Sequence, residues 1–165
     1  MLHLNSLLTT HPRMKAIVTT KNPVRLFFSW ARRGIEFRDK HEPNISIEGL
    51  VREKLDTYAE HFHHYFEGLN EAYQIHGEDR ILPVPYEKLC RNPAIIAQKM
   101  FDFTGYSFHK KYLRFDQKYS NIHQNFIDPQ YVDEFAEHLS PNTIQEIHQR
   151  TTDVLDFCPP EFFDL

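Results

Sequence analysis

A lysine between a predicted strand and a predicted helix is the first candidate for chemistry in this sequence. Residues 14–20 (MKAIVTT) form a short apolar run with β-branched side chains, which is typical of a buried strand. Lys21 follows directly, and Asn22 and Pro23 then supply a helix N-cap and a first helical residue. Because the free amides and the dipole at a helix N-terminus attract anions, a lysine beside them predicts a phosphate-binding site. The alternative interpretation is a capped helix with a solvated basic side.

Ser29 is the second candidate for this site. It lies two turns into the predicted helix, on a face that also carries Arg25 and either Arg32 or Arg33. A hydroxyl and several cations on one face, beyond the end of a strand, are suitable groups for binding a phosphate.

Composition indicates a single globular domain, residues 1–165, with 41% hydrophobic and 25% charged residues. Nineteen basic and 23 acidic residues give a net charge of −4, which provides no global field for nucleic acid. No run approaches the roughly 18 apolar residues of a membrane-spanning helix, and the opening MLHLNSLL lacks the basic start of a secretory signal. We therefore expect a cytoplasmic domain whose anion site is local.

Three other groups of residues suggest different chemistry. Residues 60–64 (EHFHH) place two histidines, or a glutamate and a histidine, on one helical face, but no third metal ligand converges on them, so we expect a solvated face and no metal. Cys90 and Cys158 lie far apart and are expected to be packing thiols. The basic, aromatic stretch 110–123 would suit stacking with single-stranded nucleic acid, but the overall acidity argues against that partner.

Strand and helix patterns alternate along the chain. After the helix that starts at Pro23 and is expected to end at Gly34, the sequence predicts a long helix, a strand and two proline-led helices; their ranges are 46–77, 80–89, 92–105 and from 140 onward. Within the predicted strand, Pro83 and Pro85 each remove a ladder donor, which favours an edge or a short strand. This order predicts an α/β fold with a small parallel sheet flanked by helices and a helix-rich C-terminal half, with ligands beyond the C-terminal strand ends.

The segment AIVTTKNPVRLFFSW, residues 16–30, resembles the 3'-phosphate-binding segment of the sulfotransferases that use 3'-phosphoadenosine 5'-phosphosulfate (PAPS). In that family an apolar strand is followed by Arg-[DN]-Pro and a helix with a serine eight residues after the arginine. Lys21 stands in the place of the arginine, and Ser29 has the matching spacing. Lysine keeps the charge but loses the planar fork of arginine, so the resemblance implies a looser phosphate contact.

Two later stretches resemble the same family in the same order. Residues 85–106 match its Tyr-Glu-[DK]-Leu, Asn-Pro and helix pattern, which implies that Tyr86 sits near the adenine. Residues 137–160 resemble its last helix. In the family's loop over the nucleotide, the resemblance implies Lys118 and Ser120 as further contacts of the 3'-phosphate.

The first residues match as well, because HLNSLL (residues 3–8) resembles a stretch that opens with a catalytic histidine. This makes His3 the candidate base for the acceptor hydroxyl. The family's loop for the 5'-phosphosulfate is rich in glycine, whereas the first glycine here is Gly34. We therefore expect an N-terminally incomplete sulfotransferase domain.

The resemblance implies a partial P-loop-like three-layer fold and transfer of a sulfuryl group from PAPS, without a metal, to a hydroxyl or amine acceptor. Two interpretations stay open: an enzyme of this kind, or a non-catalytic sulfotransferase-like module that acts in binding. A nucleotide kinase would need a Gly-rich loop and a magnesium-binding aspartate, and neither is visible. The acceptor and the oligomeric state are not encoded in any pattern we recognise.

Overall fold

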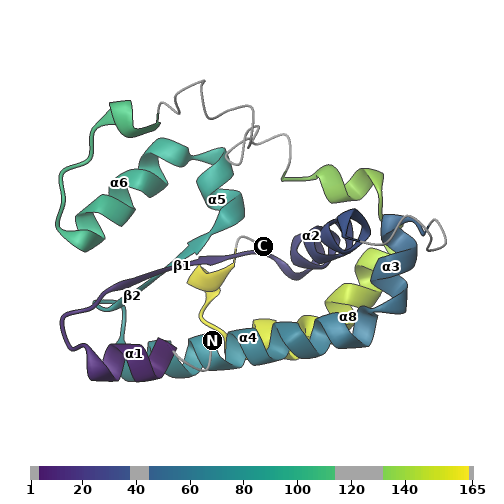
Figure 1. Cartoon of the computed structure of the whole chain (residues 1–165), viewed down its shortest axis with the longest axis horizontal. Coiled ribbons are helices and arrows are strands. Elements are labelled where there is room, and N and C mark those ends of the chain that lie inside the picture. The colour runs from purple at the N-terminus through teal and green to yellow at the C-terminus, as the bar shows by residue number, and fades with distance from the viewer. Residues whose placement is uncertain (1–3, 38–44, 114–131, 164–165) are drawn as a thin grey trace.

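A computed structural model of the chain describes residues 4–37, 45–113 and 132–163 (Figure 1). In chain order its elements are α1 (Leu4–Thr10), β1 (Ala16–Thr20), α2 (Pro23–Glu36), α3 (Ile47–Glu53), α4 (Leu55–His76), β2 (Ile81–Pro85), α5 (Tyr86–Arg91), α6 (Pro93–Thr104), η1 (Lys110–Leu113), η3 (Glu134–Glu137), α8 (Pro141–Phe157) and η4 (Pro160–Phe162). The predicted α/β class, a small parallel sheet flanked by helices, is confirmed. None of the helices in the described ranges is long and apolar enough to cross a membrane.

The sheet brings two distant parts of the chain to one edge. β1 and β2 pair in parallel, with Ala16 opposite Ile81 and Thr20 opposite Pro85. Since both strands run in the same direction and end in register, the residues that follow them leave the sheet side by side. The turn into α2 and the start of α5 are therefore neighbours.

Pro83 and Pro85 do not disturb the pairing of the two strands, because they occupy alternate positions of β2. The amide of Ala16 donates to the carbonyl of Arg80 at 2.8 Å, which fixes the phase of the parallel hydrogen bonds. In that phase the nitrogens of Pro83 and Pro85 face away from β1, so neither proline removes a hydrogen bond between the two strands. The predicted short strand is confirmed, with five residues that are all buried.

Helices cover both sides of the sheet, and the core lies on the side of the longest one. Figure 1 shows α5 and α6 on one side of the strands, and α1, α4 and α8 on the other. The core centres on Phe62 and Phe66 of α4, whose rings lie 4.5 Å apart. Phe27 of α2 and Phe163 near the C-terminus pack against this pair, at 6.2 Å from Phe62 and 4.7 Å from Phe66. This aromatic core holds α2 in place behind the strand ends.

Two predicted helix bounds were wrong. α2 continues past Gly34 to Glu36. Gly34 faces α3, and a Cβ added to it would lie 3.0 Å from a methyl carbon of Leu50. The glycine thus serves the close packing of two helices and does not end the first one. The long helix predicted over 46–77 is two helices, separated at Lys54, which has φ −107° and ψ 11°. The apolar spacing used for that prediction begins after Lys54, so it did not reveal the break.

Most predicted helix ends are confirmed. Side-chain oxygens accept a backbone N–H at three predicted N-caps, and glycines with positive φ close two helices; these residues are Asn22, Ser46 and Ser140, and Gly77 (φ 73°) and Gly105 (φ 81°). The exception is Asn92, which makes no side-chain cap although it precedes a proline-led helix.

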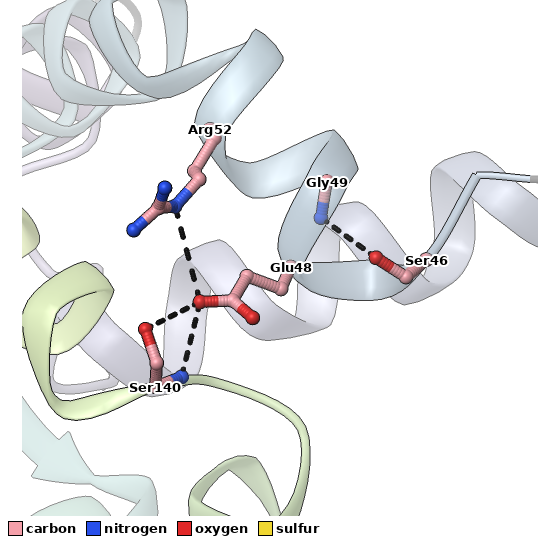
Figure 2. Close-up of a pocket in the computed structure, with 5 residues that line it drawn as sticks. All are labelled: Ser46, Glu48, Gly49, Arg52 and Ser140. Atoms are coloured by element: carbon pink, nitrogen blue, oxygen red, sulfur yellow. Dashed lines mark hydrogen bonds and ion pairs between the residues drawn. The ribbon is translucent and has the colours of Figure 1, made fainter.

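One carboxylate joins the starts of α3 and α8 (Figure 2). Glu48, in the first turn of α3, accepts hydrogen bonds at one oxygen from the Ser140 hydroxyl at 2.5 Å, the Thr143 hydroxyl at 2.6 Å and the Ser140 amide at 3.2 Å. Arg52 Nε lies 3.8 Å from the same oxygen. Hydrogen bonds from Ser140 and Thr143 lower the pKa of Glu48 to about 2. The ionised carboxylate therefore caps α8 from a different helix.

We expect Glu48→Gln to lower the free energy of unfolding by about 1 kcal/mol at pH 7, because an amide is a weaker acceptor than a carboxylate. The pKa of Glu48 is lowered on folding from 4.5 to about 2, so its contribution is complete above pH 4.5 and disappears as the pH falls through 2. Urea unfolding of both proteins across this range measures the difference.

The matched control is Glu146→Gln, which removes a carboxylate 4.0 Å from Arg52 that is not bonded to Ser140. It should change stability by less than about 0.5 kcal/mol. Equal stability of Glu48→Gln and the unaltered protein at pH 7 would contradict the capping role.

Candidate functional site

Three residues from the two strand ends meet at one aromatic ring. Lys21 follows β1 directly, and its Nζ lies 4.7 Å from the centre of the Tyr86 ring. The guanidinium carbon of Arg25, in the first turn of α2, lies 4.8 Å from the same point. The parallel register explains this meeting, since it places the residue after β2 beside the residue after β1. Two cations thus share one ring at the C-terminal edge of the sheet.

The turn after β1 is fixed by its own side chains. Asn22 caps α2, and its side-chain oxygen accepts the amide of Arg25 at 2.8 Å. Pro23 occupies the first helical position and removes an amide that would otherwise need a partner. The cap commits Arg25 to the first turn, where its side chain is only 5% exposed. Lys21 therefore stands at the N-terminus of α2, as the sequence predicts.

Tyr86 belongs to a helix that the sequence did not predict. The strand expected over residues 80–89 ends at Pro85, and Tyr86 is the first residue of α5. The start of α5 carries no side-chain cap, so the usual signal for a helix start is missing. The helix points Tyr86 toward the neighbouring turn, whereas a continued strand would carry it along the sheet.

Glu87 links the two turns and was not identified from the sequence. Its side chain is 1% exposed, and Oε1 accepts the backbone amide of Asn22 at 3.1 Å. A buried carboxylate is tolerated only where hydrogen bonds and opposite charges offset its lost hydration. Glu87 has both here, because Lys21 and Arg25 lie at the same edge. The available signal was an acidic residue near the end of the second predicted strand, opposite the end of the first strand, which Lys21 follows.

The site holds its lysine in an unfavourable environment. Burial lowers the pKa of Lys21, and the charge of Arg25 lowers it further. Glu87 acts in the opposite direction and raises this pKa, while Arg32 lowers it. Both leading effects disfavour the protonated amine, so a bound anion would stabilise it. The pKa of Tyr86 is raised to about 12, first by burial and then by its contact with Cys90, so its hydroxyl is protonated at neutral pH.

Ser29 is partly buried one turn beyond Arg25, on the same face of α2. Within the described part of the chain it makes no hydrogen bond with Lys21 or Tyr86. Arg32, a further turn along, pairs with Glu134 at 3.0 Å. The structure thus brings Lys21 and Tyr86 into contact and leaves Ser29 separate on α2.

Three candidates lie outside the described residues, namely His3, Lys118 and Ser120. Their predicted roles stay predictions.

The cavity drawn in Figure 2 is a different place from this strand-end site. It measures about 400 Å³ and is lined by Ser46, Glu48, Gly49, Arg52 and Ser140. None of these residues belongs to the group around Tyr86. The ionised Glu48 at its centre would repel a phosphate. Its hydrogen bonds are the helix-joining ones described above, and we assign it a structural role.

The histidines on α4 lie on a solvated face. His64 lies 3.8 Å from Glu60 and 3.6 Å from Glu67, with 71% of its side chain exposed. His63 lies 3.2 Å from Asp153. Among the residues that the structure describes, no group of three His, Cys, Asp or Glu side chains is arranged to hold a metal ion. Cys90 and Cys158 are buried free thiols, in keeping with a packing role.

A comparison with models of known protein families shows to which family the chain belongs. The model of the sulfotransferase family matches residues 1–110, which include both strands and the whole group around Tyr86. The chain belongs to the sulfotransferase family. Sulfuryl transfer is the general chemistry of this family, and the Lys21 segment of this sulfotransferase chain lies inside the matched range. No curated protein and no solved structure matched the chain.

We expect Glu87→Ala to lower the free energy of unfolding by about 1–3 kcal/mol, because the amide of Asn22 loses its acceptor and two cations lose a buried counter-charge. Glu87→Gln, which keeps an acceptor oxygen, should lose less. Urea unfolding at pH 7 measures both.

Glu60→Gln is the matched control for charge, since the Glu60 side chain is 69% exposed. It should stay within about 0.5 kcal/mol of the unaltered protein. If Glu87→Ala is as stable as this control, Glu87 does not join the two turns.

Proposed function

We propose that this chain is a PAPS-dependent sulfotransferase domain, residues 1–165, that transfers a sulfuryl group to a hydroxyl or amine acceptor. Family membership supports the general chemistry. The observation that carries the finer proposal is the meeting of Lys21 and Arg25 at the N-terminus of α2, beyond the end of a parallel strand. Two cations and a helix N-terminus at that edge favour a doubly charged phosphate.

In this proposal the strand-end site binds the 3'-phosphate that distinguishes PAPS from other adenine nucleotides. Lys21 supplies a charge, and the first turn of α2 supplies its dipole. Ser29 donates its hydroxyl from the next turn, and Tyr86 lies close to the adenine. Lys118 and Ser120 complete the grip on the same phosphate. The chain as a whole is acidic, so the attraction for the nucleotide is a property of this edge alone.

The transfer itself is an in-line displacement at sulfur. The acceptor oxygen or nitrogen forms a bond to sulfur while the bond from sulfur to the bridging phosphate oxygen breaks. The products are the sulfated acceptor and 3'-phosphoadenosine 5'-phosphate. The proton of the acceptor goes to a general base, for which we propose His3. Negative charge builds on the departing phosphate oxygen, and positive groups near it lower the barrier.

Calorimetric titration with 3'-phosphoadenosine 5'-phosphate tests the nucleotide site directly. We expect micromolar binding, and at least tenfold weaker binding by the double variant Lys21→Ala, Ser29→Ala, because a charge-assisted phosphate contact is lost. Adenosine 5'-monophosphate, which lacks the 3'-phosphate, should bind more weakly than the bisphosphate and should not distinguish the two proteins.

Lys15→Ala is the matched control, because Lys15 precedes β1 at the opposite end of the strand and donates to the carbonyl of Phe103 at 2.6 Å. It should bind the bisphosphate like the unaltered chain. A folded chain that binds neither nucleotide would refute the proposal. Selective binding without transfer to any acceptor would instead favour a non-catalytic binding module.

A further inference from the structure

The ring of Tyr86 is in contact with two cations. Lys21 Nζ and the guanidinium carbon of Arg25 lie at almost equal distances from its centre, 4.7 and 4.8 Å. Both fall within the range in which a cation is attracted to the negative face of an aromatic ring. The ring is therefore an electrostatic partner of these side chains as well as an apolar surface.

Without the ring, the two cations would tend to separate. Like charges repel, and Lys21 has a long, flexible stem that allows its ammonium to move into solvent. Arg25 cannot follow, because α2 holds it in the first turn with 5% of its surface exposed. A ring that attracts both cations counteracts their repulsion and keeps Lys21 beside Arg25. The arrangement of the two charges is thus prepared in advance.

We propose that Tyr86 is a positioning residue for the 3'-phosphate, which holds Lys21 against its ring beside Arg25, and that Arg25 is the second positive charge of this site. The inference rests on the function proposed above. It gives Tyr86 a role that acts through the two cations, in addition to its place near the adenine. A phosphate then meets two desolvated charges that need no reorganisation, and desolvated charges are screened less than surface ones.

This role also accounts for the lysine at a place where related segments carry arginine. A single ammonium offers no planar fork, but the charge of Arg25 adds to its field at the same edge. The buried position of Arg25 suits a role through charge, with Lys21 making the direct contact.

The test separates the 3'-phosphate from the adenine. Dissociation constants for 3'-phosphoadenosine 5'-phosphate and adenosine 5'-monophosphate are measured by calorimetry for the unaltered chain, Tyr86→Phe and Tyr86→Leu. We expect Tyr86→Leu to reduce the preference for the bisphosphate by roughly five- to thirty-fold, as two cation contacts with a ring are lost. Its affinity for the monophosphate should fall by a smaller factor, since only the contact of the ring with the adenine is lost there. Tyr86→Phe should keep the preference because it keeps the ring.

A double variant tests whether Tyr86 acts through Lys21. Lys21→Met alone should reduce the preference for the bisphosphate, and adding Tyr86→Leu should reduce it by less than the product of the two single effects. Phe103→Leu is the matched control, since Lys15 Nζ lies 4.7 Å from the Phe103 ring in a cation contact of the same length elsewhere. This control should leave the preference unchanged. Thermal unfolding verifies that each variant is folded, and Tyr86→Met repeats the measurement if Tyr86→Leu does not fold.

The outcomes distinguish this inference from the proposed function. If Tyr86→Leu weakens both nucleotides by the same factor, Tyr86 acts on the adenine alone and the positioning role is wrong, while the nucleotide site stands. If the unaltered chain shows no preference for the bisphosphate, the proposed function fails and this inference fails with it.

Discussion

The hydrogen bond between the buried Glu87 carboxylate and the amide of Asn22 is the constraint on which the strand-end site depends. Parallel pairing alone brings the ends of β1 and β2 together, but it does not fix the direction in which the chain leaves each strand. The Glu87 contact fixes both turns at once, because it joins the first turn of α5 to the N-cap of α2. Lys21 and Tyr86 each lie one residue before a partner of this bond, so their contact follows from it. A buried carboxylate is costly to maintain, and its hydrogen bond to Asn22 and the positive charges at the same edge offset that cost.

The edge beyond the strand ends carries positive charge, although the whole chain is acidic. The sequence carries a net charge of −4, yet two basic side chains and one carboxylate converge beyond the strand ends. Arg25 and Glu87 are buried and Lys21 is half-buried, so their interactions are stronger than they would be on the surface. Glu87 offsets part of the repulsion between Lys21 and Arg25. The carboxylate stabilises the fold of this edge, and the three groups together keep a positive charge.

Local features of the sequence predicted most of the elements, and contacts between distant residues explain what it missed. The Asn22 cap, Pro23 and the run before Lys21 act within a few residues, so their pattern can be read directly, and the caps at Ser46 and Ser140 are of the same kind. Gly34 was wrongly predicted to end α2, because the residue that requires a glycine there, Leu50, lies on another helix. The break at Lys54 and the uncapped start of α5 carry no local signal. Glu87 is far from Asn22 in the sequence, and Arg25 is far from Tyr86, so their contacts form only when the two strands pair.

A family motif locates a residue, whereas the groups around it decide what it does. Tyr86 follows a strand in a pattern that resembles an adenine-contacting tyrosine, and that pattern says nothing of cations. In this chain the same ring contacts Lys21 and Arg25. The Asn22 cap fixes the turn that carries the two cations, and α5 fixes Tyr86. The family segment that this one resembles carries an arginine where Lys21 stands. In the role proposed for Tyr86, a lysine suits this place because the ring and the fixed charge of Arg25 restrict its flexible ammonium. In the proposed phosphate site, the strength of the contact would then depend on three residues together, and changing any one of them should alter the effect of the other two.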